Sequence, residues 1–201
     1  MAIMPAAGRL ATLPFVVEAF STERLIARPW SAAKDAETAY AIYASPEVTR
    51  FLREITLPLP SVEAARAVLA TWSTPWEDPA FGTWAVWPRD GSAPVGTVFI
   101  RPLAPANVDV EIGWHLGTEH WGHGYATEIG RAAARHAFKN GVSEVYAVIV
   151  PGNERSVGVA RRLGMQYVGR TEKYSGVEVQ LYRLRPDDLR PTTVDLHGPY
   201  R

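Results

Sequence analysis

The stretch Trp121-Gly122-His123-Gly124-Tyr125-Ala126-Thr127 opens the most regular helical pattern in the chain. From Tyr125 to Lys139, apolar residues recur every three or four positions, which predicts a helix with one buried face. Asn140-Gly141 predicts its end, because glycine tolerates the left-handed conformation that follows a helix. Two glycines permit close backbone approach, and the first turn of a helix offers unpaired N–H groups at its positive end. The stretch therefore predicts a phosphate-binding loop, although a glycine-bearing loop without a ligand would have the same pattern.

Two other kinds of phosphate-binding loop fit this stretch poorly. A P-loop requires Gly-Lys-Ser/Thr at the start of the helix, whereas the chain has Gly124-Tyr125-Ala126 there. A dinucleotide site requires a third glycine and an early strand–helix–strand unit. Here Thr127 occupies the position of the third glycine, and a long series of predicted strands comes before the loop. The sequence therefore disfavours both nucleotide sites.

Outward from this helix, alternating and buried apolar segments predict the strands of one sheet. These segments are 15–17, 25–29, 83–87, 95–101, 108–116, 145–150, 165–169 and 177–184. Further helices are predicted over 31–43, from an N-cap at Ser61 to Trp72, and from Glu154 to Leu163 before Gly164. The segment 46–60 carries three prolines and predicts a loop. This order of elements predicts a mixed α/β protein with one central sheet.

The segment Val108–Leu116 has the cleanest alternation in the chain. Its apolar side chains share one face, which we expect to pack in the core. The opposite face carries Asp109, Glu111, Gly113 and His115, which we expect to face a cleft. Catalytic side chains are therefore expected on this second face.

The length and composition of the chain limit the functions that are possible. The chain has 201 residues, a formal net charge of zero and no cysteine. It therefore has neither disulfides nor a cysteine nucleophile, and it lacks the basic footprint of a nucleic-acid binder. No apolar run is long enough to span a membrane, so we expect a cytoplasmic protein without nucleic-acid or membrane partners. We predict a loose extension over 1–14, one domain over 15–185 and a tail over 186–201.

Several motifs, in this order, resemble the GNAT superfamily of N-acetyltransferases. They are Thr22-Glu23-Arg24-Leu25 with Arg28-Pro29-Trp30, Glu111-Ile112-Gly113-Trp114, the segment from His120 to Glu128, Asn153-Glu154-Arg155-Ser156 and Leu163-Gly164-Met165. The resemblance covers about 21–185 and is closest to the branch that includes ribosomal-protein N-terminal acetyltransferases. It implies a single α+β domain of the GNAT fold, with a mixed, mostly antiparallel central sheet flanked by helices.

The resemblance also implies an activity. A GNAT enzyme moves an acetyl group from acetyl-CoA to a primary amine, which attacks directly in a ternary complex, and the absence of cysteine agrees with that route. The expected partners are acetyl-CoA as cosubstrate and an amine acceptor, either a protein N-terminus or a small amine. No metal is expected, and the protein is expected to be a monomer or a homodimer. The alternative is a catalytically silent module that binds acyl-CoA.

The family's signature, Gln/Arg-x-x-Gly-x-Gly/Ala, maps onto Trp121–Ala126, with Trp121 in place of Gln/Arg. The resemblance implies that amides of this loop hold the CoA pyrophosphate, and that the end of the preceding strand pairs with the pantetheine arm. It also implies that Asn153 and Ser156 contact CoA. The expected cofactor-binding residues are Trp114, His115, Leu116, Trp121, Gly122, His123, Gly124, Tyr125, Ala126, Thr127, Asn153 and Ser156.

The chemistry requires a proton acceptor, because an alkylammonium with a pKa near ~10 must lose a proton before it attacks. Glu111, on the cleft-facing side of its strand, is the candidate base, and Asp109 and His115 are weaker candidates. The resemblance makes Ser156 the candidate proton donor to the leaving thiolate, since Ala160 occupies the usual position of a tyrosine. Asn153 has an ordinary structural explanation as the N-cap of a helix. We expect the loops 46–60 and 170–176 to form the acceptor site.

Overall fold

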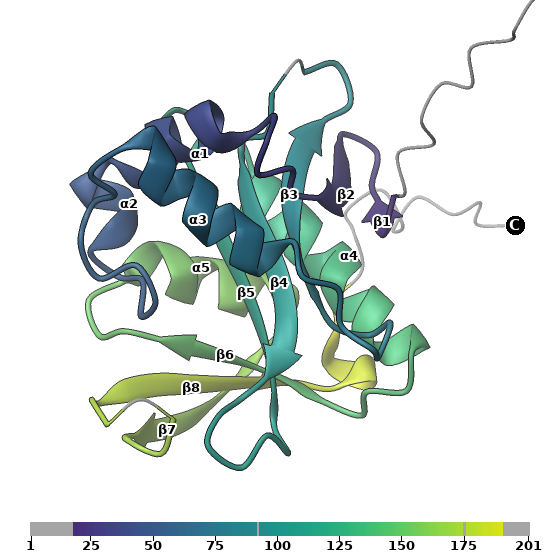
Figure 1. Cartoon of the computed structure of the whole chain (residues 1–201). Coiled ribbons are helices and arrows are strands. Elements are labelled where there is room, and N and C mark those ends of the chain that lie inside the picture. The colour runs from purple at the N-terminus through teal and green to yellow at the C-terminus, as the bar shows by residue number, and fades with distance from the viewer. Residues whose placement is uncertain (1–17, 92, 175, 191–201) are drawn as a thin grey trace, which may run out of the picture.

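A computed structural model describes residues 18–190, with the exception of 92 and 175. The predicted strand at 15–17, the extension over 1–14 and most of the predicted tail lie outside the described residues. One eight-stranded sheet organises the described part, in the order β1-β2-β3-β4-β5-β6-β8-β7 (Figure 1). All of its pairings are antiparallel except the parallel pair of β5 and β6. The sheet is therefore mixed and mostly antiparallel, as predicted.

The strands are β1 (Phe20–Ser21), β2 (Leu25–Pro29), β3 (Gly82–Pro88), β4 (Gly96–Pro102), β5 (Val110–Leu116), β6 (Val145–Ile149), β7 (Gln166–Thr171) and β8 (Val179–Leu184). The helices are α1 (Ala36–Tyr43), α2 (Pro46–Thr49), α3 (Val62–Trp72), α4 (Tyr125–Lys139) and α5 (Glu154–Leu163). Two short 3₁₀ helices, η1 (Thr118–His120) and η2 (Pro186–Asp188), complete the described elements.

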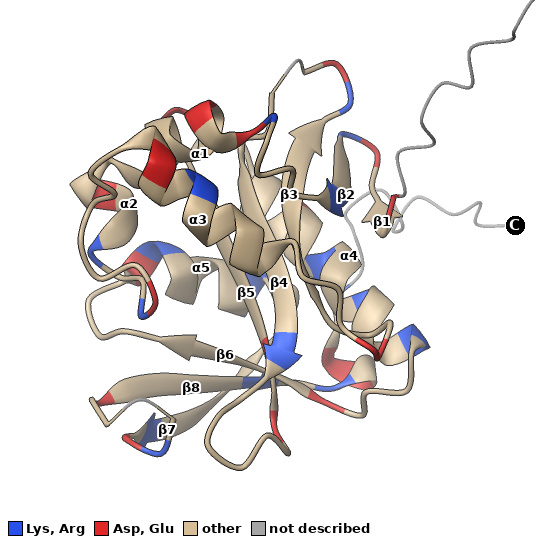
Figure 2. Cartoon of the chain, viewed as in Figure 1, with Lys and Arg blue, Asp and Glu red and all other residues tan. Residues whose placement is uncertain are grey.

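Helices cover both faces of the sheet. On one face, α4 and α5 pack against the strands around a core that includes Ile112, Ile129 and Leu163. On the other face, α1 to α3 surround a second core that includes Tyr43, Leu69 and Ala85. Figure 1 shows α3 in front of the sheet and α4 behind it. Basic and acidic residues are interspersed over the visible elements (Figure 2), in agreement with a formal net charge of zero.

The two helices that carry the predicted site begin and end where their sequence signals predict. The helix α4 begins after Gly124 and is followed by Gly141, at φ +90°. The helix α5 ends at Gly164, whose φ of +94° is left-handed. A left-handed backbone favours glycine because it lacks a Cβ. These glycines therefore fix the lengths of α4 and α5.

The structure differs from the sequence-based expectation in three places. The helix α1 begins at Ala36 rather than at 31, because Asp35 accepts a hydrogen bond from the backbone N–H of Ser31 and closes a turn there. The segment predicted as loop contains α2, which starts with Pro46 at a position where its missing N–H costs nothing. Val108 is 75% exposed and precedes β5, so the predicted alternation begins two residues too early.

The strands β5 and β6 diverge. Only Glu111 and Tyr146 are in register between them, so the later part of β5 has no strand partner on that side. Figure 1 shows β6 and β8 running across the direction of β4 and β5. Backbone N–H and C=O groups on an unpaired strand edge are available to a ligand. The divergence therefore opens the sheet beside the end of β5.

Candidate acetyl-transfer site

Two cavities meet at the opening between β5 and β6. The larger, of about 530 Å³, is a groove between the start of α4 and the face of α5. The smaller, of about 70 Å³, lies among the loop 51–55 and the strands β4, β5 and β6. Both cavities are lined by Phe51, Leu52, Trp114, His115, Asn153 and Ser156. The two cavities therefore share part of their lining at these six residues.

The start of α4 forms an open cradle of backbone N–H groups. Gly122 and Gly124 have φ of +82° and +80°, and a Cβ at Gly122 would meet no atom within 4 Å. The first hydrogen bond of the helix runs from the N–H of Glu128 to the carbonyl of Gly124, at 3.0 Å. The three preceding amides have no partner within the helix, and Gly124 has no side chain to cap them. This geometry fits a phosphate group.

Three arginines that the sequence analysis did not select lie around this groove. The Arg155 guanidinium lies 4.2 Å from the centre of the Trp121 ring, and Arg162 Nε donates to Thr127 Oγ1 at 3.0 Å. Arg24 donates to the carbonyl of His123 at 3.2 Å. Arg155 and Arg162 lie seven positions apart, which places them on one face of α5. This spacing is the sequence signal from which these two arginines could have been predicted. Arg155 and Arg162 line the groove together with Glu47 and Glu154, and Arg24 pairs with Glu128, so groups of both charges lie near the cradle.

All but one of the expected cofactor-binding residues line the larger groove. His123 is the exception, and its ring lies 5.7 Å from that of Tyr125. Trp121, which replaces the family's usual Gln/Arg, donates its indole N–H to the carbonyl of Leu116 at 2.9 Å. This bond fastens the loop to the end of β5. Trp121 thus has a structural contact in addition to lining the groove.

Glu111 is buried, not open to solvent. It is 3% exposed, and it is the acidic centre of a charged cluster in the smaller cavity. Arg53 pairs with its Oε1, while the Nε and Nη2 of Arg101 donate to its Oε2 at 3.1 and 2.9 Å. Arg101 also pairs with Glu54. Glu111 is therefore not a solvated carboxylate, because Arg53 from the loop before α3 and Arg101 from β4 contact it.

His115 lines both cavities, and its ring packs among aromatic side chains. Its ring packs near Tyr43, Trp72 and Phe99, with centroid distances of 6.1, 6.3 and 5.4 Å. Its Nδ1 is buried and has no hydrogen-bond partner among the described residues. Burial lowers the pKa of His115 to about 4. The imidazole is therefore neutral near pH 7 and a weak proton acceptor.

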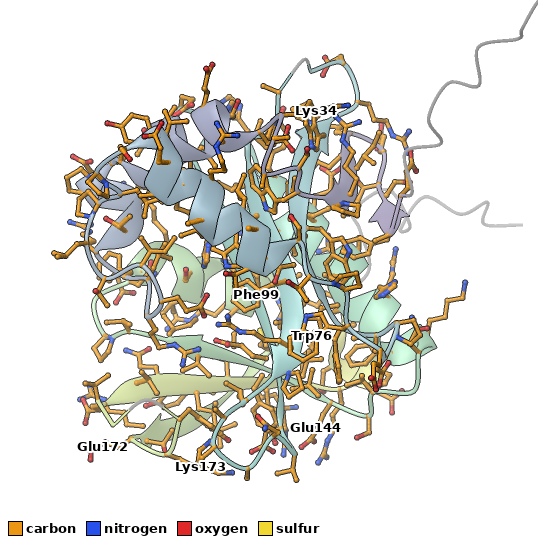
Figure 3. All side chains as sticks on the ribbon, in the orientation of Figure 1. Lys34, Trp76, Phe99, Glu144, Glu172 and Lys173 are labelled. Atoms are coloured by element: carbon orange, nitrogen blue, oxygen red, sulfur yellow. The ribbon has the colours of Figure 1, made fainter. Side chains whose placement is uncertain are left out.

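Asp109 lies away from both cavities. Its Oδ2 accepts from Lys173 Nζ at 2.7 Å and from the Tyr174 hydroxyl at 2.8 Å. Figure 3 shows Lys173 at the lower edge of the molecule, whereas Phe99, which lines the smaller cavity, lies near the centre. The described residues of the loop 170–176 line neither cavity, and Lys173 and Tyr174 hold the loop to Asp109. Of the two expected acceptor loops, the one before α3 lines the smaller cavity.

The start of α5 places Ser156 where the two cavities join. Asn153 caps the helix, and its Oδ1 accepts from the backbone N–H of Ser156 at 3.2 Å. The ordinary structural explanation of Asn153 is therefore correct, and the residue also lines both cavities. Ala160, at the family's usual tyrosine position, is fully buried in the core beside α4.

Comparison with known proteins agrees with this fold. The family model described as the acetyltransferase (GNAT) domain matches residues 24–166. The chain therefore belongs to the GNAT acetyltransferase family and is an acyltransferase. It is 29% identical over 154 residues, 76% of this chain, to the uncharacterized N-acetyltransferase YoaA of Bacillus subtilis strain 168, and the match covers 85% of that protein. It is 25% identical to the uncharacterized N-acetyltransferase p20 of Bacillus licheniformis, over 82% of this chain and 92% of that protein.

Solved structures share the fold. An acetyltransferase from Agrobacterium tumefaciens C58 has a TM-score of 0.65 at 27% identity, covering 82% of this chain and 92% of that one. A proposed ribosomal-protein-serine acetyltransferase from Vibrio cholerae has a TM-score of 0.67 at 20% identity, covering 83% and 96%. At that identity the second likeness concerns the fold alone.

No helix in the described ranges is long and apolar enough to cross a membrane. Among the same residues, no three His, Asp or Glu side chains are grouped so that they could hold a metal ion.

Proposed function

We propose that the protein transfers an acetyl group from acetyl-CoA to a primary amine, with the donor in the larger groove and the acceptor entering through the smaller cavity. The observation that carries this proposal is the junction of the two cavities at Ser156 and His115. In a direct transfer, the amine and the thioester must meet without an intermediate on the protein. Two cavities that join at one point meet that requirement.

The donor groove fits CoA in three respects. The N–H groups at the start of α4 suit a pyrophosphate, and Arg155 and Arg162 add positive charge along the groove. The unpaired edge of β5 offers backbone groups to the amides of a pantetheine arm. N–H donors there would also stabilise the oxyanion that forms when an amine attacks a thioester, and one such donor contributes about 2.7–4 kcal/mol in other enzymes.

Two side chains that line the cavities remain candidates for proton transfer. Ser156 is proposed as the proton donor to the leaving thiolate. Glu111 was predicted as the base, and it lines the acceptor cavity, but both of its oxygens already accept from guanidinium groups. Proton transfer from the amine to Glu111 would therefore need a water molecule or a rearrangement of Arg53 and Arg101.

The acceptor class is the open part of the proposal. The branch of ribosomal-protein N-terminal acetyltransferases is supported by the motifs of this sequence, and the Vibrio cholerae likeness adds only the fold. We propose a protein N-terminus or a small primary amine as the acceptor. A silent acyl-CoA-binding module is the second candidate, favoured by Ala160, whose position carries no tyrosine hydroxyl.

A screen of acceptors with labelled acetyl-CoA tests the proposed function. The panel contains peptides with free N-termini, including one that begins with serine, together with polyamines and an aminoglycoside. We expect label to pass to at least one amine, with one CoA released per acetyl group transferred. If the protein binds acetyl-CoA but acetylates none of these amines, the silent module is the better description.

Substitution of Gly124 tests the donor groove. Gly124→Val should weaken acetyl-CoA binding at least about tenfold, because a β-branched residue at positive φ costs about 1–3 kcal/mol and would reshape the cradle. Its Cβ would also lie 3.5 Å from the Nη2 of Arg24. Isothermal titration calorimetry with acetyl-CoA measures the effect.

Gly141→Val is a matched control for this substitution. Gly141 follows the opposite end of α4, has a φ of +90°, and has open space around its Cβ position. The control should carry similar backbone strain and bind acetyl-CoA as the wild type does. Equal affinities for the two valine variants and the wild type would remove the cradle from the donor site.

A further inference from the structure

Four charged side chains form a chain of contacts along the acceptor cavity. Arg53 pairs with Glu111, Glu111 with Arg101, and Arg101 with Glu54. The strand β5 supplies Glu111, and β4 supplies Arg101. The other two residues belong to the loop between α2 and α3. The cluster therefore ties this loop to the central strands.

Exposure distinguishes the two carboxylates. The Glu111 side chain is 4% exposed and the Glu54 side chain 39%, while the two arginines are 19% and 22% exposed. Glu54 is thus the outermost charge of the four, and it lines the acceptor cavity. An incoming amine would meet this carboxylate first.

The contacts of the two carboxylates also differ. Both oxygens of Glu111 are engaged by guanidinium groups. Among the described residues, the ion pair of Glu54 is made with Arg101, at Oε1, and its side chain is the most exposed of the four. Burial alone would raise the pKa of Glu54, but its hydrogen bond to Arg101 and that residue's charge hold the pKa below its ordinary value. The carboxylate is therefore ionised at neutral pH.

Contacts with Glu111 and Phe99 hold the Arg101 side chain in place, and the ion pair with Arg101 in turn holds the Glu54 side chain. The Arg101 guanidinium makes two hydrogen bonds to Glu111 and lies 4.2 Å from the centre of the Phe99 ring. A fixed carboxylate loses less conformational entropy on binding than a free surface glutamate would. Glu111 therefore acts as a positioning residue, which holds the arginine that holds Glu54.

We propose that Glu54 is the residue that recognises the acceptor, by binding the ammonium form of a primary amine as it enters the smaller cavity. The acceptor class is then an amine that is cationic at neutral pH. This inference rests on the proposed function and extends it to the acceptor. Glu54 contributes binding and orientation, while the small fraction of free amine goes on to attack.

The test compares Glu54→Gln, Glu54→Asp and Glu178→Gln with the wild type, using the best cationic amine from the acceptor screen. Among the described residues Glu178 pairs with Arg170 at the surface and lines neither cavity, so its variant is the control. Glu54→Gln should raise the KM for the amine about fivefold or more, with kcat changed less than about twofold. Acetyl-CoA affinity should not change, and Glu54→Asp should recover part of the loss.

Added salt supplies a readout that a purely structural role would not affect. The wild-type KM for the amine should rise with salt, because the partly exposed ion pair is screened, and this rise should shrink in Glu54→Gln. An unchanged KM in Glu54→Gln, or a loss confined to kcat, overturns the assignment. A wild type that acetylates no amine overturns the proposed function and this inference together, whereas amine acetylation that is indifferent to residue 54 overturns this inference alone.

Discussion

Glu111→Gln is expected to lower the free energy of unfolding by about 3 kcal/mol. Loss of one partner from a buried ion pair costs about 3–5 kcal/mol, because the other charge stays buried without compensation. Here two guanidinium groups lose the same partner, but Arg53 and Arg101 are 19% and 22% exposed, so water offsets part of the cost. We therefore expect a value at the lower end. Denaturant unfolding with an unchanged m-value measures it.

Glu178→Gln is the matched control for the unfolding experiment. It also removes the carboxylate of a Glu–Arg pair, but Glu178 and Arg170 are 49% and 59% exposed. An exposed pair contributes about 0–1 kcal/mol, so this variant should unfold close to the wild-type midpoint. If the two variants lost equal stability, the buried cluster would not be a structural element of the acceptor cavity.

Kinetics of Glu111→Gln separate positioning from proton transfer. If Glu111 accepts the amine proton, its loss matters most near neutral pH, and the deficit in kcat/KM shrinks at high pH where free amine is abundant. If it only positions Arg101 and Glu54, the deficit lies in the KM for the amine rather than in kcat, as in Glu54→Gln. A pH–rate profile of the variant parallel to that of the wild type would remove Glu111 from the role of base.

The sequence predicted best where local signals determine the structure. The ends of α4 and α5 follow from Gly124, Gly141 and Gly164, because a left-handed backbone favours glycine at those positions. The alternation of β5 correctly separated Ile112, in the core, from Glu111, on the opposite face. Such signals lie within a few residues of the feature that they specify.

The parts that the sequence could not predict depend on residues far apart in the chain. The partners of Glu111 are Arg53, 58 positions away, and Arg101 on a neighbouring strand. Alternation alone places a side chain on a face, but it does not say whether helices cover that face. The same limit applies to the loop 170–176, whose attachment to Asp109 spans more than 60 residues.

Ser156→Ala should lower kcat by about ten- to a thousandfold, as expected for the loss of a general acid. A thiol has a pKa near ~8.5, so a thiolate leaves more easily than an alkoxide and its protonation helps to a limited extent. The motivation is positional: Ser156 lines both cavities at their junction, while Ala160 is buried in the core. The hydroxyl-bearing Tyr174 and Tyr182 line neither cavity.

The acetyl-CoA affinity and the stability of Ser156→Ala show whether a loss of turnover reflects proton transfer, cosubstrate binding or folding. The cap of α5 should survive, because Asn153 accepts from the backbone N–H of residue 156, which alanine retains. Acetyl-CoA affinity should change little, since the amides at the start of α4 are untouched, and Ser156→Thr should recover part of kcat through its hydroxyl. Full turnover in the alanine variant would assign the proton to solvent. A loss of acetyl-CoA binding in step with activity would make Ser156 a binding residue, because a group that acts only on the leaving thiolate contributes nothing to the affinity for the intact thioester.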